Sequence, residues 1–315
     1  MKSLGRVAGD ARPRLPAALL ALAAVALAAC GNAGGTTPAS SVTTTPGPAS
    51  AKDLQALKGA AAAGLSETAT FTISLDGATV FGRSPSVHGS GSFDFRAPRG
   101  TVSLSPSGTT LNEPLVFAPQ AVYIRPPASS ESLPKGKAWI MANLSDTRAL
   151  STNLPDFVTE VESLNPALTL SEVLWGGTSA ARSGTDTIRG QKVSRYDVKV
   201  DLEQALAAAS GSAQAPLALA LKAEIRSLSG SAAPASASSG SAQIEVRAWV
   251  GDSGRLLRVR LTPPGAGVGT MTLDLTGFGT AVQAGIPPAD QVADVAAITP
   301  AAERENNNGG DSDGA

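Results

Sequence analysis

The sequence predicts an α+β fold built on a single antiparallel β-sheet that curls. Apolar residues recur with a period of two in many separate runs, which is typical of half-buried strands. Helical periodicity returns in only a few stretches, and helices do not alternate regularly with strands as they do around a parallel sheet. We expect about ten strands, which is more than a flat open sheet holds without curling.

The N-terminus contains the signals of an exported protein. A basic start that includes Lys2 and Arg6 precedes an apolar run (15–29), and Cys30, the only cysteine of the chain, follows directly. The apolar run is shorter than the roughly 20 residues of a membrane-spanning helix. Residues 1–29 are therefore predicted to be a cleaved signal peptide.

The segment 27–30 (Leu-Ala-Ala-Cys) resembles the bacterial lipoprotein signal, in which diacylglycerol is attached to the cysteine and the peptide before it is removed. This resemblance implies that Cys30 is the lipid attachment site and that the protein is anchored at the outer, extracytoplasmic face of the cell membrane. Two acyl chains hold a protein stably at a membrane without a spanning helix. The alternative is a buried cysteine in an N-terminal helix.

Composition and charge exclude some classes of function. The chain has 25 Lys and Arg and 26 Asp and Glu, so it lacks the basic balance that is typical of nucleic-acid binding. With one cysteine, the fold has to be held by its apolar core and not by disulfides. Aromatic residues make up only 4% of the chain, so we expect an aliphatic core that is either loosely filled or built around a space.

The mature chain is predicted to divide into three parts. Residues 30–50, which are the lipidated cysteine and an uncharged stretch rich in Gly, Thr, Ser and Pro, should form a flexible tether. Residues 51–298 should form the folded domain. The Asn- and Gly-rich end, 299–315, is predicted to be disordered.

The first half of the domain is predicted to be one helix and a series of strands. Apolar residues recur at three- and four-residue steps in 51–66, which predicts an amphipathic helix. Strands divided by Pro- and Gly-containing turns are expected at 68–75, 87–95, 99–105, 115–117, 121–125 and 137–142. Gly89 and Gly91 lie on the face of their strand that should be buried, which suggests sharp curvature or close approach by another group.

The second half returns to helical spacing at 155–175, where we expect two short helices broken near Asn165 and Pro166. The pattern then predicts strands from 178 and at 195–202, a helix at 217–228, a loop at 229–242, and strands at 244–250, 257–261 and 270–275. After Pro288 the chain is expected to leave the sheet.

The last three predicted strands each have one apolar and one charged face. Pairing of these neighbours would place Glu245 and Asp274 among Arg247, Arg258 and Arg260 on the wet face. Exposed ion pairs of this kind contribute only tenths of a kcal/mol each.

Two motifs resemble catalytic sequences but are better explained as turns. Residues 251–254 (Gly-Asp-Ser-Gly) match the tetrapeptide around a serine-protease nucleophile, yet they lie between two predicted strands, where Asp-Ser-Gly favours a hairpin. The one candidate base is His88, which lies on the polar side of a strand. The glycine-rich stretch 265–270 is followed by a strand and not by a helix, so it does not indicate a phosphate loop.

The remaining polar residues do not predict an active site. Asp156, Glu160 and Glu162 share a predicted helix, and no second acidic cluster can be tied to them for acid–base chemistry. With one histidine and no free cysteine, a transition-metal site is not expected. We therefore predict no catalytic residue, no metal and no cofactor.

The order of parts resembles a known family. The lipoprotein signal, the tether, the single helix, the curling sheet, the mid-chain helical insertion and the segments 195–198 (Arg-Tyr-Asp-Val) and 254–259 (Gly-Arg-Leu-Leu-Arg-Val) are similar to actinobacterial lipoproteins of the LppX/LprG type, in the LolA/LolB-like superfamily. The likeness covers about 51–298. It implies a half-barrel whose helices enclose an apolar cavity for acyl chains, and a non-catalytic role in carrying lipids or lipidated molecules in the cell envelope. The Ser- and Ala-rich insertion at 210–242 is longer than this family pattern.

Period two also predicts which side chains line that cavity, because a strand sends alternate side chains to one face. The expected lining residues are Phe71, Ile73, Phe93, Val198, Val200, Val246, Ala248, Val259, Leu261, Met271 and Leu273. The alternative is an ordinary core, in which Leu54, Leu57, Val161 and Leu174 of the helices fill the space completely.

Three functions stay open on the sequence alone. The first is a lipid or lipoglycan carrier, which would have the membrane, its ligand and an envelope transporter as partners. The second is a protein-binding sensor or regulator of envelope stress with the same fold. The third is an esterase that uses Ser253 as its nucleophile.

Overall fold

The computed structural model places most of the predicted domain. The residues that it describes are 47–77, 86–106, 113–126, 133–144, 161, 164–210, 215–231, 242–263 and 269–294. Cys30, the signal peptide and the predicted C-terminal tail lie outside these residues, as do Asp156, Glu160 and Glu162. In the described part of the chain, no helix is long and apolar enough to cross a membrane.

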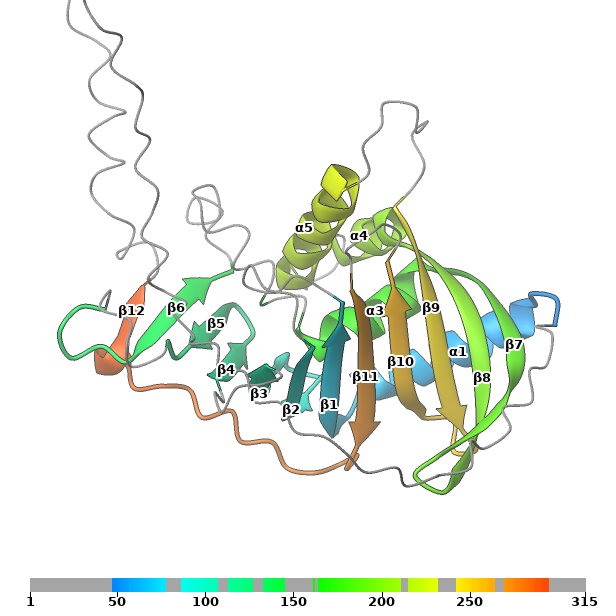
Figure 1. Ribbon diagram of the computed structural model, residues 1–315, viewed down its shortest axis with the longest axis horizontal. Coiled ribbons are helices and arrows are strands. Elements are labelled where there is room, and N and C mark those ends of the chain that lie inside the picture. The colour runs from blue at the N-terminus through cyan, green and yellow to red at the C-terminus, as the bar shows by residue number, and fades with distance from the viewer. Residues whose placement is uncertain are drawn as a thin grey trace, which may run out of the picture.

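One sheet of twelve described strands dominates the molecule, and helices lie on one of its faces, so the α+β prediction is confirmed (Figure 1). The strands are β1 (Thr68–Asp76), β2 (Val87–Asp94), β3 (Arg99–Pro106), β4 (Glu113–Ala118), β5 (Ala121–Ile124), β6 (Trp139–Asn143), β7 (Gly177–Ile188), β8 (Gln191–Asp201), β9 (Gln243–Gly251), β10 (Leu256–Thr262), β11 (Thr270–Thr276) and β12 (Val292–Asp294). Their order across the sheet is β12-β6-β5-β4-β3-β2-β1-β11-β10-β9-β8-β7. Neighbours are antiparallel, except that β12 pairs with β6 in parallel. Because β12 and β7 lie at opposite edges, the sheet curls without closing.

The period-two pattern of the sequence becomes alternating burial along the strands. In β1, Phe71 and Ile73 are buried whereas Thr72 between them is exposed. Phe71 lies opposite Leu275 of β11 on one side and opposite Gly91 of β2 on the other. The inner face of the sheet is therefore apolar across neighbouring strands, as the sequence predicts.

Two glycines let the sheet pack closely at β2. A Cβ atom on Gly89 would lie 2.8 Å from Ile73 Cγ2 and 2.9 Å from Leu104 Cδ2. A Cβ atom on Gly91 would lie 3.0 Å from Phe71 Cζ. Side-chain and backbone atoms of the neighbouring strands thus occupy the space above these glycines, which confirms the close approach predicted from the sequence.

Four helices in the described residues cover the inner face: α1 (Ala51–Leu65), α3 (Pro166–Gly176), α4 (Leu202–Ser210) and α5 (Ala215–Ser231). Helix α1 packs against β7 to β10, and α3 packs against α1 and α4 (Figure 1). Helix α5 packs on α4 and α3. The second predicted helix of 155–175 is α3, and most of the first lies outside the described residues.

Side-chain caps fix where two of these helices begin. The Ser50 hydroxyl accepts a hydrogen bond from the Asp53 N–H at 3.1 Å, at the start of α1. The Asn165 side chain accepts one from the Ala167 N–H at 3.0 Å, and Pro166 stands at the first position of α3, where its missing N–H costs nothing.

Helix α4 corrects the prediction that Leu202 ends a strand. Leu202 is the first residue of α4, because the carboxylate of Asp201 accepts hydrogen bonds from the N–H groups of Glu203 and Gln204 at 3.0 and 3.1 Å. Such a cap satisfies the free donors of a first helical turn. The alternation of β8 happens to continue into Leu202, which is why the sequence pattern placed the residue in a strand.

The C-terminal segment corrects a second prediction. The chain does not leave the sheet after Pro288, because β12 pairs in parallel with β6, with Val292 opposite Trp139. The N–H of Ala138 also donates to the carbonyl of Gln291 at 2.9 Å. A strand of three residues is too short to show a period.

The end of the predicted tether is also part of the fold. The N–H of Gly47 donates to the carbonyl of Arg182 at 3.2 Å, and the N–H of Ser50 donates to the carbonyl of Ala180 at 3.0 Å. Residues 47–50 therefore lie along the edge strand β7, and the prediction of a tether that continues to residue 50 is wrong at this end.

A register shift turns Leu257 away from its predicted face. The β9–β10 pairing is irregular between Leu256 and Arg258, so Leu256 joins the main core and Leu257 points to the other side. There Leu257 packs with Ile188, Val193 and Trp249 in a small second apolar cluster.

The charged face follows the prediction in part. Arg258 pairs with Asp274 across β10 and β11, with 2.7 Å between Nε and Oδ1. Arg247, however, pairs with Asp197 of β8 at 2.8 Å, and not with Glu245, which precedes it by two residues on β9 and lies opposite Lys199. Both ion pairs therefore join residues of adjacent strands, β8 with β9 and β10 with β11.

Candidate functional site on the concave face

The structure brings the predicted lining residues together on the inner face of the sheet. One apolar cluster contains ten of them, and the eleventh, Met271, packs against it partly buried. The ten are Phe71, Ile73, Phe93, Val198, Val200, Val246, Ala248, Val259, Leu261 and Leu273. Their place in one cluster agrees with the period-two pattern, and their role in lining a ligand site stays a prediction.

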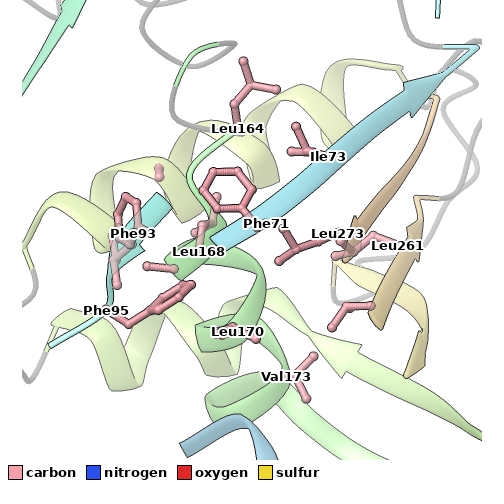
Figure 2. Packing of buried hydrophobic residues seen from close by; sticks show 14 of the residues in the cluster. Phe71, Ile73, Phe93, Phe95, Leu164, Leu168, Leu170, Val173, Leu261 and Leu273 are labelled. Carbon is pink, nitrogen blue, oxygen red and sulfur yellow. The ribbon is translucent and has the colours of Figure 1, made fainter. Parts of the chain in front are cut away.

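Helices cover this face with apolar side chains of their own. Leu168, Leu170 and Val173 of α3 lie among Phe71, Phe93 and other sheet residues in Figure 2. From the other helices, the same cluster includes Leu57 of α1, Ala205 of α4 and Leu217 and Leu221 of α5. Helix α3 is buried on every side, because it lies inside the concavity with the sheet below it and other helices around it.

Tight contacts hold α3 in this position. A Cβ atom on Gly176, at the end of α3, would lie 2.8 Å from Val200 Cγ1 and 3.2 Å from Ala205 Cβ. A Cβ atom on Gly64 of α1 would lie 3.3 Å from Leu170 Cδ1. Glycines at these positions therefore let α3 approach both the sheet and α1 closely.

Two pockets among the described residues lie away from the concave face. One, of about 350 Å³, lies where β1 begins and β2 ends, and charged side chains such as Asp94 and Arg96 line it. The other, of about 620 Å³, is an open groove on the outer face of β1 to β3 and β11, lined by Ser and Thr side chains and by His88. Neither pocket is the apolar cavity expected beneath the sheet.

The first pocket is held by ion pairs. Asp94 is buried and accepts from Arg96 with 2.9 Å between Oδ1 and Nε, and Arg99 lies 3.6 Å away. Hydrogen bonds from Arg96 lower the pKa of Asp94, against the opposing effect of its burial. Arg255 and Glu67 form a further pair at 2.9 Å nearby. We interpret this pocket as a structural junction between strand ends, since its buried charge is already paired.

A buried pair of glutamates is the feature that the sequence pattern did not predict. Glu172 of α3 is 2% exposed, and its carboxyl group shares a hydrogen bond with that of Glu224 on α5. The second carboxyl oxygen of Glu172, Oε2, and the hydroxyl of the neighbouring Ser171 are both buried and have no hydrogen-bond partner among the described residues. One signal was available: Glu172 is the only charged residue in the otherwise apolar stretch 166–176.

Burial decides the ionisation of this pair. It raises the pKa of Glu172 well above the ordinary value of 4.5, and the negative charge of Glu224 and the hydrogen bond to it raise it further. Burial also raises the pKa of Glu224, whereas its hydrogen bond to Glu172 lowers it. These directions mean that the pair keeps a proton at pH values at which an exposed glutamate is ionised.

The esterase hypothesis finds no geometric support among the described residues. Ser253 is exposed in the turn between β9 and β10, where the N–H of Gly254 donates to the carbonyl of Gly251 at 2.9 Å, so the predicted hairpin is confirmed. His88 lies on β2, and β1 and β11 separate that strand from β10. The fold thus does not bring the serine and its one candidate base together.

The described residues also bear on the predictions about a metal site and about the glycine-rich stretch 265–270. No group of three His, Cys, Asp or Glu side chains within them could hold a metal ion. The glycine-rich stretch 265–270 lies mostly outside them, but it connects the antiparallel strands β10 and β11.

The protein thus belongs to the class of α+β folds in which helices lie in the concavity of an open, strongly curled and mostly antiparallel sheet. No protein-family model matches the sequence. No curated protein matches it either.

Among solved structures, the described fold is similar to LprF from Mycobacterium bovis, with 12% identity over 77% of this chain and 100% of that chain and a TM-score of 0.43. It is similar to the lipoprotein LppX from Mycobacterium tuberculosis, with 13% identity over 74% and 98% and a TM-score of 0.42. It is also similar to a LolA superfamily protein from Nitrosomonas europaea, with 7% identity over 75% and 94% and a TM-score of 0.24. The fold assignment itself rests on the strand order and register given above.

Proposed function

We propose that this protein is an exported lipoprotein, anchored to the outer face of the cell membrane through Cys30, that binds and carries lipids or lipidated molecules on its concave apolar face. The observation that carries the proposal is that face itself. It is formed by side chains of both halves of the sheet, and it is covered by separate helices and not by a second sheet.

The size of the hydrophobic effect makes such a site effective without any signature residue. An acyl chain of about fifteen methylenes gains on the order of 12 kcal/mol from burial, at about 0.8 kcal/mol for each methylene. The cost of association has to be subtracted from this figure, and it is of the order of 4 to 15 kcal/mol. A bound chain would in addition replace contacts that the helices now make with the sheet, so net affinity depends on how easily a helix moves.

Helix α5 is the element whose displacement would open the face. It packs on α4 and α3, and it contributes Leu217 and Leu221 to the core, whereas Ile225 and Leu228 nearer its end are only partly buried. Helices α1 and α3 are fixed by closer packing against the sheet and each other. We therefore place the entrance for an acyl chain beneath α5.

A bulky residue on the inner face tests the proposal. Ala248 is fully buried on β9, between Tyr196 of β8 and Val259 of β10. Replacing it by tryptophan (Ala248→Trp) fills the space that an acyl chain would use, and we expect the affinity for a fluorescent fatty acid to fall at least tenfold. Because a face that accommodates an acyl chain also has room for the indole ring, the loss of stability should stay near the lower end of the ~1 to 3 kcal/mol that overpacking costs.

Thr262→Trp is the matched control, since Thr262 is exposed at the end of the adjacent strand β10. It should bind the fatty acid as the unchanged protein does. If Ala248→Trp melted early while fatty-acid binding was absent from the parent protein as well, the concave face would be an ordinary core and the proposal would be wrong.

A further inference from the structure

A polar contact lies between the two helices that cover the centre of the concave face. Glu172 is the only charged side chain of α3 and is almost completely buried, and Glu224 comes from α5. Glu224 is partly exposed as a residue, and its carboxyl group shares a hydrogen bond with that of Glu172. This is the one described contact between ionisable groups of α5 and α3.

The contact depends on a proton. Two carboxylates that have lost their water cannot both be ionised at hydrogen-bond distance, so one proton has to stay between them. With Glu172 protonated, its O–H donates to Glu224 and the helices attract each other. With both groups ionised, like charges face each other in a poorly hydrated space and the helices repel.

The closed arrangement also leaves hydrogen bonds unmade. Oε2 of Glu172 and the hydroxyl of Ser171 are buried without a partner among the described residues. Buried polar groups without partners are destabilising, and water would satisfy both groups if α5 moved away.

Charged side chains that the structure describes also lie on the elements around the pair. On α5, Lys222 is exposed, and on α4, Glu203 is exposed in the first turn. Lys58 of α1 lies beside Gly177, just past the end of α3, and Asp201 at the end of β8 is engaged in capping α4. The pKa values of Glu172 and Glu224 are shifted by burial and by the effect of each carboxyl group on the other.

The geometry points to a pH-sensitive latch, in which the carboxyl pair Glu172–Glu224 holds α5 closed over the concave face while it shares a proton and releases α5 when that proton is lost. The latch concerns the movement of α5, so it can be tested with no lipid present.

The direction of the pH response follows from the folded state. Both groups bind their protons more tightly in the closed protein than in water, because burial raises the pKa of each above 4.5. The stabilisation of the closed state is therefore complete at pH values below the ordinary range of glutamate, and it is lost as the pH rises through the raised pKa values. Helix α5 should be closed in acid and open in base.

A distance measurement between spin labels tests the latch. The Cys30→Ala protein has no other cysteine, so labels can be placed at Lys222→Cys on the exposed side of α5 and at Lys52→Cys on α1. Between pH 5 and pH 8 we expect a second, longer distance to appear and the ratio of open to closed molecules to rise at least tenfold. Release of one proton changes such a ratio by up to tenfold per pH unit.

Two variants separate the pair from other titrating groups. Glu172→Gln keeps a donor for Glu224 but cannot ionise, so α5 should stay closed up to pH 8. Glu203→Gln, on the exposed side of α4, should respond to pH as the parent does. A parent protein whose distances do not change with pH would overturn the latch, as would a full pH response in Glu172→Gln.

The parent titration alone decides the question if Glu172→Gln does not fold, and Glu224→Gln, at the partly exposed partner, then serves as the second variant. Its pH response should be at least threefold weaker than that of the parent, and an unchanged response would count against the pair. A failure of the latch would leave the fatty-acid test of the concave face unaffected, so the two proposals can fail separately.

Discussion

The absence of a Cβ atom at Gly91 allows the strands next to β2 to pack closely against it. At Gly91 an added methyl group would meet Phe71 Cζ at 3.0 Å and the backbone carbonyl carbon of Thr101 at 2.9 Å. A backbone group cannot move aside as the end of a flexible side chain can. The glycine is therefore required by the space available and not by an unusual backbone angle, since Gly91 is not among the glycines with positive φ.

Gly91→Ala should consequently lower the free energy of unfolding by about 1 to 3 kcal/mol, which is the usual cost of overpacking. Gly59→Ala is the matched control, because a Cβ atom on Gly59 in α1 would have no atom within 4 Å. Alanine is favoured over glycine in a helix by about 1 kcal/mol, so this control should become more stable. Urea unfolding of both variants is the measurement, and an equal change of either sign in the two would contradict this account of the sheet.

Individual residues also show where a sequence pattern loses information. Glu172 and Glu224 are far apart in the chain and belong to different helices, so no spacing rule connects them. The pairing appears only once α3 and α5 are packed together. By contrast, the close packing around Gly89 and Gly91 could be predicted, because the period-two pattern already places both residues on the apolar face of one strand.

At the scale of elements, α3 depends on its first residue. Asn165 is buried and caps α3 by accepting from the Ala167 N–H, whereas Ser50 caps α1 in an exposed position. Removing a cap costs about 0.5 to 2 kcal/mol, and burial of the freed N–H brings the cost toward the upper value.

Asn165→Ala should therefore destabilise the protein by about 2 kcal/mol, and Ser50→Ala by about 0.5 kcal/mol. Thermal or urea unfolding of the two variants is the check. Equal and small losses would show that α3 is held by its apolar packing alone and that its cap matters little.

Elements with one wet face are the ones that the sequence predicts well. β1, β9 and β11 alternate cleanly between apolar and polar residues, and each was predicted to within one or two residues. Helix α4 was missed because Leu202 extends the alternation of β8 and because the cap at Asp201 is a local hydrogen bond, not a period. Strand β12 was missed because three residues show no pattern and its partner β6 is distant in sequence.

At the scale of the whole molecule, the sheet is wide enough to wrap around its helices and still remains open. A sheet of twelve strands with an apolar inner face has to bury that face, and α1, α3, α4 and α5 do so in the described part of the chain. The general architecture follows from the sequence, because many half-buried strands and few helices leave little other choice. The degree to which the helices fill the concavity does not follow from the sequence, because it depends on how side chains from separate elements meet.

The central claim is that the concave face binds acyl chains. The most direct measurement is mass spectrometry of the lipids released by denaturing the Cys30→Ala protein after purification from its own host, because this variant has no anchor of its own to release. The account predicts close to one equivalent of an acyl lipid, reduced at least tenfold in Ala248→Trp and unchanged in Thr262→Trp. A protein that purifies without lipid and takes up none from vesicles of host lipid would contradict it.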